Sequence, residues 1–93
     1  MATGIAEHEF IVKTITLNSP ALTTKSTSGA YYGSFNCDSI SGYTPVYVGT
    51  SYWAGVKYLI DVQLSNGNTK IDIISWGSQT TGTIKINVLY QKT

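Results

Sequence analysis

The sequence predicts an all-β protein: one antiparallel β-sandwich or jelly roll of six to seven short strands. Three observations predict it. Apolar residues recur mostly at every second position, which is the period of a half-buried strand. Gly, Asn, Ser and Pro separate these stretches at short intervals, as in two-sheet β proteins. No segment of ten or more residues has the 3.6-residue period of a helix.

The length of 93 residues suits one domain with one core. We expect residues 9–93 to form the sandwich and residues 1–8 to be a flexible amino-terminal segment. That segment lacks the basic stretch and apolar run of a signal peptide. No apolar stretch approaches the roughly 20 residues of a membrane span, so membrane insertion is not expected.

The first half of the chain gives the less regular strand pattern. Strands are predicted at residues 9–17, 21–25, 30–36 and 43–52, with the second of these a short edge strand. Pro45 cannot donate a backbone hydrogen bond, so the strand that holds it should lie at an edge or begin near it.

The second half alternates more strictly, and we expect a three-strand meander there. Its strands are predicted at residues 56–64, 69–76 and 83–91. Asn66-Gly67 separates the first two and is typical of a two-residue hairpin turn.

A two-residue turn fixes the hairpin register, and this register places Asp61 opposite Asp72 on the outer face. Like charges directly opposite each other cost stability, so we expect compensation. We favour neutralisation by Lys70 or Lys85. The alternatives are a calcium site of two carboxylates and carbonyl oxygens and a catalytic pair as in glycoside hydrolysis. A flat sheet face lacks the cleft that this last reaction needs.

The same register gives the outer face apolar residues. It places Leu59 opposite Ile74, and Lys57 opposite Trp76, where the ammonium would form a cation–π contact. Apolar side chains on a solvent-facing sheet indicate either a covering segment or a subunit interface. We predict an oligomer interface at Leu59, Ile74 and Trp76.

Charge and cysteine content exclude several classes of protein. Charged residues make up 12% of the chain, about half the usual share. The six basic residues are scattered lysines without arginine, so a nucleic-acid partner is not expected. Cys37 is the single cysteine and allows no intrachain disulfide; we expect it to be a small buried hydrophobe. This hydroxyl-rich, weakly charged composition suits a secreted or virion-exposed protein.

Catalytic motifs are missing from the sequence. It contains no G-x-S-x-G, no H-E-x-x-H and no P-loop. His8 lies between two glutamates in the terminal segment, so we do not expect it in a catalytic triad. The prediction is a protein that is not an enzyme and that needs no cofactor or metal.

Aromatic residues are the strongest hint of a binding surface. The chain holds seven tyrosines and two tryptophans, and two aromatic pairs are adjacent in sequence, so one member of each should face outward. Exposed Tyr and Trp beside Asn, Ser and Asp are typical of saccharide sites, although core and interface roles are common too. The predicted stacking residues are Tyr31, Tyr32, Tyr52 and Trp53, and the predicted hydroxyl-binding residues are Asn36 and Asp38.

Two stretches resemble a known family. Residues 39–49, Ser-Ile-Ser-Gly-Tyr-Thr-Pro-Val-Tyr-Val-Gly, resemble a segment near the carboxyl end of tail and minor structural proteins from phages and prophages of Gram-positive bacteria. Residues 82–92, Gly-Thr-Ile-Lys-Ile-Asn-Val-Leu-Tyr-Gln-Lys, resemble the terminal strand of the same proteins. The resemblance spans roughly residues 36–93. Tyr47 departs from it, because a small or aliphatic residue is frequent there.

This resemblance implies a distal module of a phage tail fibre or baseplate receptor-binding protein, located on the virion tail. Such modules are β-rich, usually homotrimeric, and recognise host cell-wall saccharides or surface proteins. Two alternatives stay open: a purely structural module that trimerises and caps a fibre, and a carbohydrate-binding module of a cell-wall enzyme.

Overall fold

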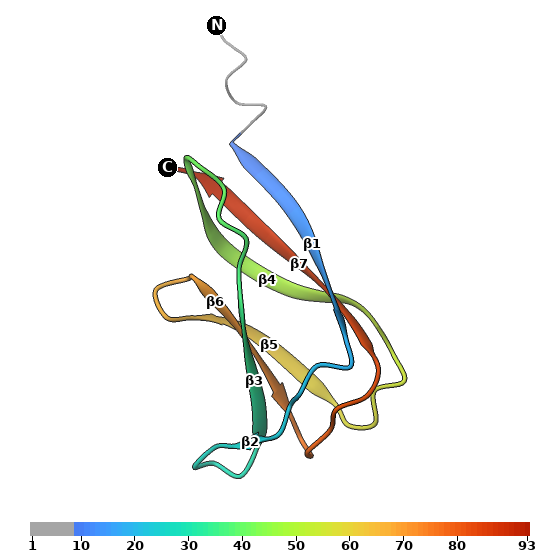
Figure 1. Cartoon of the computed structure of the whole chain (residues 1–93). Helices are drawn as coiled ribbons and strands as arrows, with labels where there is room; N and C mark the ends of the chain where they lie inside the picture. Colours follow the sequence, from blue (N-terminus) through green and yellow to red (C-terminus); the bar gives the residue numbers. More distant parts are fainter. Residues whose placement is uncertain (1–8) are drawn as a thin grey trace, which may run out of the picture.

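A computed structural model describes residues 9–93, and the segment predicted to be flexible, residues 1–8, lies outside the described residues. The described chain forms two antiparallel sheets and contains no helix (Figure 1). Accordingly, no helix in residues 9–93 is long and apolar enough to cross a membrane. The predicted all-β fold with two antiparallel sheets is confirmed.

Residues 9–93 contain seven strands, each within a few residues of a predicted one. One sheet has three strands in the order β1-β7-β4, and the other has four in the order β2-β3-β6-β5. The strands are β1 (Phe10–Asn18), β2 (Thr24–Lys25), β3 (Tyr31–Asn36), β4 (Tyr43–Ala54), β5 (Ile60–Ser65), β6 (Lys70–Ser75) and β7 (Thr83–Lys92).

Strand β7 forms the centre of the three-stranded sheet, paired with β1 on one side and β4 on the other (Figure 1). Its alternate side chains are fully buried, and burying each aliphatic one contributes about 1.5–3 kcal/mol. These inward residues are Ile84, Ile86, Val88 and Tyr90.

The predicted carboxyl-terminal meander is wrong in one respect. Strands β5 and β6 form a hairpin, but β7 leaves them and joins the other sheet. The connection between Ser75 and Thr83 carries the chain from one sheet to the other. Alternation fixes which face of β7 is buried but does not specify its neighbours, because any strand with a matching face can pair with it.

The crossing connection is held by the side chain of Gln79, which is 6% exposed. Its Oε1 accepts hydrogen bonds from the backbone N–H groups of Lys57 at 2.8 Å and Tyr58 at 3.2 Å. Its Nε2 donates to Ser75 Oγ at 2.7 Å and to the Tyr58 carbonyl at 3.3 Å. The Gln79 backbone exchanges hydrogen bonds with Leu22 in both directions. One residue therefore joins the end of β6 to the connections that precede β5 and β2.

These bonds also explain why β5 starts later than predicted. The alternating pattern begins at residue 56, whereas the strand begins at Ile60. The N–H groups of Lys57 and Tyr58 bond to the Gln79 side chain, so they are not available to a neighbouring strand.

The hairpin between β5 and β6 closes with a four-residue loop instead of the predicted two-residue turn. Asn66, Gly67 and Asn68 all have positive φ, at 52°, 66° and 62°. The Thr69 N–H donates to the Ser65 carbonyl at 3.1 Å and closes the loop. Asn and Gly tolerate this left-handed region better than other residues, so three of them in succession permit the longer loop.

The longer loop shifts the predicted pairing by two residues. Asp61 lies opposite Ile74, and Asp72 lies opposite Gln63, so the predicted Asp61–Asp72 pair is wrong. A shift of two keeps every side chain on its predicted face, because side chains alternate with a period of two. The buried face of the hairpin was therefore predicted correctly from a wrong register.

Strand β4 is an edge strand, as Pro45 predicts. Its pairing with β7 is interrupted twice, between Pro45 and Tyr47 and between Thr50 and Tyr52. Each interruption inserts one extra residue and so changes the face on which the following side chains lie. As a result, Tyr47 and Tyr52 both lie on the outer face of the three-stranded sheet.

The core is formed by the inner faces of β6 and β7 together with residues from the connections and edge strands. Cys37 is half-buried against this core rather than fully enclosed. The buried apolar cluster consists of Leu22, Val48, Ile71, Ile73, Ile84, Ile86, Val88 and Tyr90.

Replacing Gln79 should destabilise the fold strongly. Gln79→Ala leaves two backbone N–H groups without their partner and removes the hydrogen bonds donated to Ser75 Oγ and the Tyr58 carbonyl. We expect the free energy of unfolding to fall by about 3 kcal/mol. Urea unfolding followed by circular dichroism measures this change. Gln91→Ala, at an exposed position of β7, is the matched control and should stay within about 0.5 kcal/mol of the parent chain. A loss below about 1 kcal/mol for Gln79→Ala would contradict the role assigned to its side chain.

Candidate functional site

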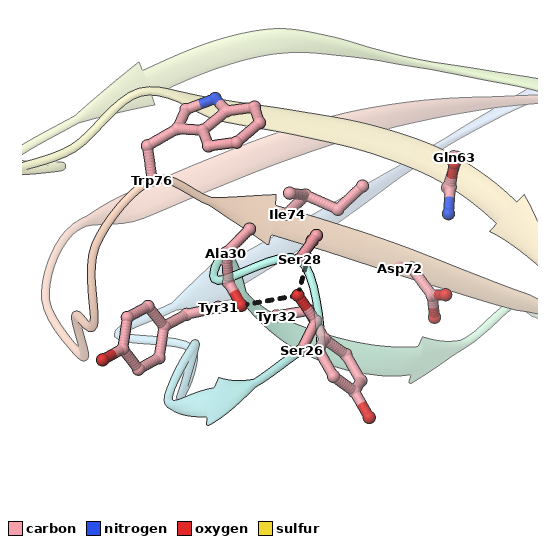
Figure 2. Close-up of a pocket in the computed structure, with 9 residues that line it drawn as sticks. All are labelled: Ser26, Ser28, Ala30, Tyr31, Tyr32, Gln63, Asp72, Ile74 and Trp76. Carbon is pink, nitrogen blue, oxygen red and sulfur yellow. Dashed lines mark hydrogen bonds between the residues drawn. The ribbon is translucent and has the colours of Figure 1, made fainter.

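A hollow of about 450 Å³ opens on the outer face of the four-stranded sheet, near the end of β6 (Figure 2). It combines aromatic, aliphatic and polar side chains. The lining residues are Ser26, Ser28, Ala30, Tyr31, Tyr32, Gln63, Asp72, Ile74 and Trp76.

Two rows of paired residues form the floor of the hollow. Tyr32 on β3 lies opposite Ile74 on β6, and in the next row Ser34, Asp72 and Gln63 lie side by side across β3, β6 and β5. Because side chains alternate along each strand, both rows lie on the same face. An aromatic and aliphatic row therefore borders a polar one.

Trp76 follows β6 directly and is 64% exposed. Its backbone N–H donates to the Leu59 carbonyl at 3.1 Å. The ring of Tyr58 lies against Gly77, where a Cβ atom would come within 2.7 Å of the ring atoms, so a larger residue here would displace the ring. Figure 2 shows the Trp76 indole and the Tyr32 ring on either side of Ile74. The backbone of this wall is thus fixed while its indole faces solvent.

The carboxylate of Asp72 is oriented by two serine hydroxyls. Ser65 Oγ donates to Asp72 Oδ1 at 3.0 Å, and Ser34 Oγ donates to the same oxygen. Within residues 9–93, Oδ2 accepts no hydrogen bond and the amide of Gln63 makes none. Both groups can therefore bond to a ligand.

The loop between β2 and β3 supplies a hydroxyl-bearing rim. Ser26 Oγ donates to the Ala30 carbonyl at 2.8 Å, and the Ser26 and Ser28 hydroxyls are hydrogen-bonded at 2.9 Å (Figure 2). Gly29 has a φ of 94°, and its N–H donates to the Ser26 carbonyl at 3.1 Å. These bonds hold the loop in a tight turn beside the hollow.

The hollow brings together residues from two different predicted sets. Tyr31 and Tyr32 were predicted to bind ligand, whereas Ile74 and Trp76 were predicted to form an oligomer interface, and all four line it. Leu59, the third predicted interface residue, is 71% exposed and lies beside Trp76.

The other predicted ligand residues lie elsewhere. Asn36 is at the far end of β3, and Asp38 lines a second hollow of about 330 Å³ together with Cys37. Tyr52 and Trp53 belong to the other sheet and are 50% and 52% exposed. The structure therefore does not gather the six predicted ligand residues into one site.

Two predicted cross-strand contacts are corrected by the observed register. Trp76 lies opposite Leu59 instead of Lys57, and Leu59 therefore does not lie opposite Ile74. The Lys57 ammonium instead lies 5.6 Å from the centroid of the Tyr58 ring. The predicted cation–π contact between Lys57 and Trp76 is wrong because the β5–β6 pairing is shifted by two residues from the predicted register.

The compensation expected at Asp72 also differs. Lys85 belongs to the other sheet, where its ammonium lies 5.4 Å from the centroid of the Tyr52 ring. The hydroxyls of Ser34 and Ser65 take the place expected for a lysine. Within the described chain, no group of three or more His, Cys, Asp and Glu side chains could hold a metal ion.

Five lining residues belong to neither the predicted ligand set nor the predicted interface set: Ser26, Ser28, Ala30, Gln63 and Asp72. A usable signal existed for Gln63 and Asp72, because alternation assigns both to the outer face of the hairpin. Their position beside Tyr32 depends on the pairing of β3 with β6, and the pattern of residues within one strand does not predict that pairing.

The hollow has the character of a small polar-ligand site. Aromatic and aliphatic surfaces offer stacking, and a carboxylate and an amide offer directional hydrogen bonds. Comparison of the chain with protein-family models, curated proteins and solved structures finds no match. The functional inference therefore depends on the chemistry of this surface.

The backbone of Asp38 is hydrogen-bonded to the buried core. The fully buried Tyr90 donates its hydroxyl hydrogen bond to the Asp38 carbonyl at 2.7 Å. Burial raises the pKa of Tyr90, and the nearby Cys37 and Asp38 raise it further. Burial, followed by the Asp38 charge, also raises the pKa of the Cys37 thiol. A thiol with a raised pKa is a poor nucleophile, so this cysteine does not resemble a catalytic one.

These pKa shifts predict a loss of stability in alkali. A raised pKa in the folded state means that folding favours the neutral form of the side chain. The folded state is therefore fully stabilised at pH values below the pKa of the unfolded chain, which is near 10 for tyrosine. This stabilisation is lost as the pH rises through the folded pKa. Tyr90→Phe should cost about 1 kcal/mol at pH 7, through the lost hydrogen bond, and should reduce the alkaline decline.

Urea unfolding at a series of pH values from about 7 to 11 measures both effects. Tyr52→Phe, which removes a hydroxyl from an exposed side chain outside the proposed interface, is the control and should leave the stability close to that of the parent chain. An alkaline decline in Tyr90→Phe as steep as that of the parent would rule out the contribution of Tyr90.

Proposed function

We propose that this chain is a non-catalytic adhesion module that binds saccharide in the hollow on the outer face of the four-stranded sheet. One observation carries the proposal: the exposed ring of Trp76 and the ring of Tyr32 flank an aliphatic floor beside a pre-oriented carboxylate. A pyranose ring presents an apolar C–H face and a hydroxyl edge, and it needs both kinds of partner.

The energetics favour a shallow saccharide site. Stacking on an aromatic ring removes apolar surface from water without a deep cavity. Hydrogen bonds to a charged group contribute about 1.5–3 kcal/mol each, more than those between neutral groups. The Asp72 carboxylate is held by Ser34 and Ser65 before any ligand arrives, so little side-chain order is lost on binding.

The composition of the lining supports binding without catalysis. Hydrolysis of a glycosidic bond commonly uses two carboxyl groups on opposite sides of the scissile bond. Asp72 is the one carboxyl group among the described residues that line the hollow. A binding module needs only one such group to hold hydroxyls.

The resemblance to phage tail proteins supports a place on the virion tail. In that setting the ligand is a saccharide of the host cell wall. Adhesion by a tail protein commonly gains strength from several copies bound at once, because linked sites raise the effective concentration of each other.

Removing the aromatic walls should abolish saccharide binding. Trp76→Ala and Tyr32→Ala should each weaken binding to host cell-wall polysaccharide by about tenfold or more, since aromatic anchors dominate such contacts. Tyr52→Ala removes an aromatic of similar exposure from the other sheet and should change affinity by less than about twofold. Isothermal titration and a glycan array measure the effect, with circular dichroism to check folding. Unchanged binding in the Trp76→Ala, Tyr32→Ala double variant would refute the site.

A second candidate function is assembly of several copies of this chain, and an apolar patch on the other sheet favours it. On the outer face of the three-stranded sheet, Val12 and Tyr47 lie on either side of Leu89 in one row and are 59% and 65% exposed. Phe10, near this row, is 52% exposed. Contiguous exposed apolar residues often mark subunit interfaces. This face suits an interface better than the predicted one, because a subunit over Ile74 and Trp76 would cover the hollow.

Sedimentation equilibrium tests the assembly. We expect a trimer that Tyr47→Asp dissociates and that Trp76→Asp leaves intact, because a buried unpaired charge is costly only at the interface. A parent chain that stays monomeric at all concentrations would contradict the assembly. A trimer without saccharide binding would favour a fibre-capping module, and a monomer with saccharide binding would favour a module of a cell-wall enzyme.

A further inference from the structure

The charge in the hollow has a single sign. Among the described residues that line it, Asp72 is the one acidic residue and none is a lysine. Asp61 lies on the same face, opposite Ile74, and Lys70 lies two residues from Asp72 along β6. Among the outward-facing residues of the four strands themselves, two carboxylates and one ammonium leave one net negative charge.

The position of the negative charge is fixed. Ser34 on β3 and Ser65 on β5 both donate to Asp72 Oδ1, so the carboxylate is held from the two flanking strands. Within residues 9–93, Oδ2 has no donor of its own. A ligand hydroxyl or ammonium group can donate to this oxygen. A phosphate, sulfate or carboxylate group cannot, and it adds a like charge.

Gln63 supplies the complementary partner. It lies directly opposite Asp72, at a Cβ separation of about 5 Å for such antiparallel pairs. Its amide both donates and accepts hydrogen bonds. Asp72 and Gln63 can therefore hold two adjacent polar groups of one sugar ring, a hydroxyl or amine that donates and a hydroxyl that accepts.

We infer that the hollow selects neutral and amino sugars with adjacent polar groups and excludes sugars that carry an anionic group. This selectivity rests on the proposed saccharide function and adds the class of ligand to it. The aromatic walls supply affinity for any ring with an apolar face, whereas Asp72 and Gln63 decide which substituents are accepted.

The test compares matched sugars at low ionic strength, where charge effects are least screened. Three sets of sugars are titrated, with the gluco, galacto and manno configurations. Each set contains the neutral hexose, the hexosamine, the hexuronate and the hexose 6-phosphate. Two-dimensional NMR shift perturbation gives each dissociation constant. In any set that binds, we expect the uronate and phosphate to bind at least about tenfold more weakly than the neutral parent.

Two isosteric variants identify the source of the selectivity. Asp72→Asn should weaken the binding of the neutral sugar. It should also reduce the difference in affinity between neutral and anionic sugars to less than about threefold. Asp61→Asn removes a carboxylate from the same face outside the lining, opposite Ile74, and should reduce this difference less than Asp72→Asn does.

The outcomes separate the two proposals. If no sugar of any set changes the NMR chemical shifts of the residues that line the hollow, the saccharide function itself fails. If anionic sugars bind the parent chain as tightly as neutral ones, the selectivity fails while the saccharide function stands. If Asp72→Asn retains the full difference, Asp72 is not its source and the inference is overturned.

Discussion

The buried amide of Gln79 is the interaction on which the rest of this structure depends. Its four hydrogen bonds are all made inside the protein, and two of them go to backbone N–H groups at least 20 positions away in sequence. Buried polar groups are tolerated only when they are satisfied, and a satisfied network specifies one arrangement of the segments it joins. Here it fixes where β6 ends and where the chain crosses to the other sheet.

The surface that we propose binds saccharide follows from that crossing. Ser75 Oγ receives a hydrogen bond from Gln79 and donates one to the Gly77 carbonyl at 2.6 Å, so the residues around Trp76 are held on both sides. The indole is then presented at the end of the sheet by a fixed backbone. A stacking ring placed in this way loses little conformational entropy on binding, which matters for a shallow site with few contacts.

Local periodicity was sufficient for the strands but not for their partners. Alternation located all seven strands and the buried face of β7, because each side chain's face depends only on its position within its own strand. It failed for the β5–β6 register, where Asn68 extends the left-handed loop beyond Asn66 and Gly67. It also failed to place Trp76 beside Tyr32, since that proximity depends on β3–β6 pairing and on distant bonds such as those of Gln79.

The two motifs that resemble phage tail proteins belong to the same sheet. Residues 39–49 include the first part of β4, and residues 82–92 include β7. These strands pair directly, with Val48 opposite Val88. Neither motif contributes a side chain to the hollow, whose lining comes from the other sheet and its loops. Both motifs instead contribute side chains to the buried core, Val48 from the first and Ile84, Ile86, Val88 and Tyr90 from the second. Under the proposed function, ligand choice could change through the lining of the hollow without disturbing that packing, as would suit a recognition module on a constant scaffold.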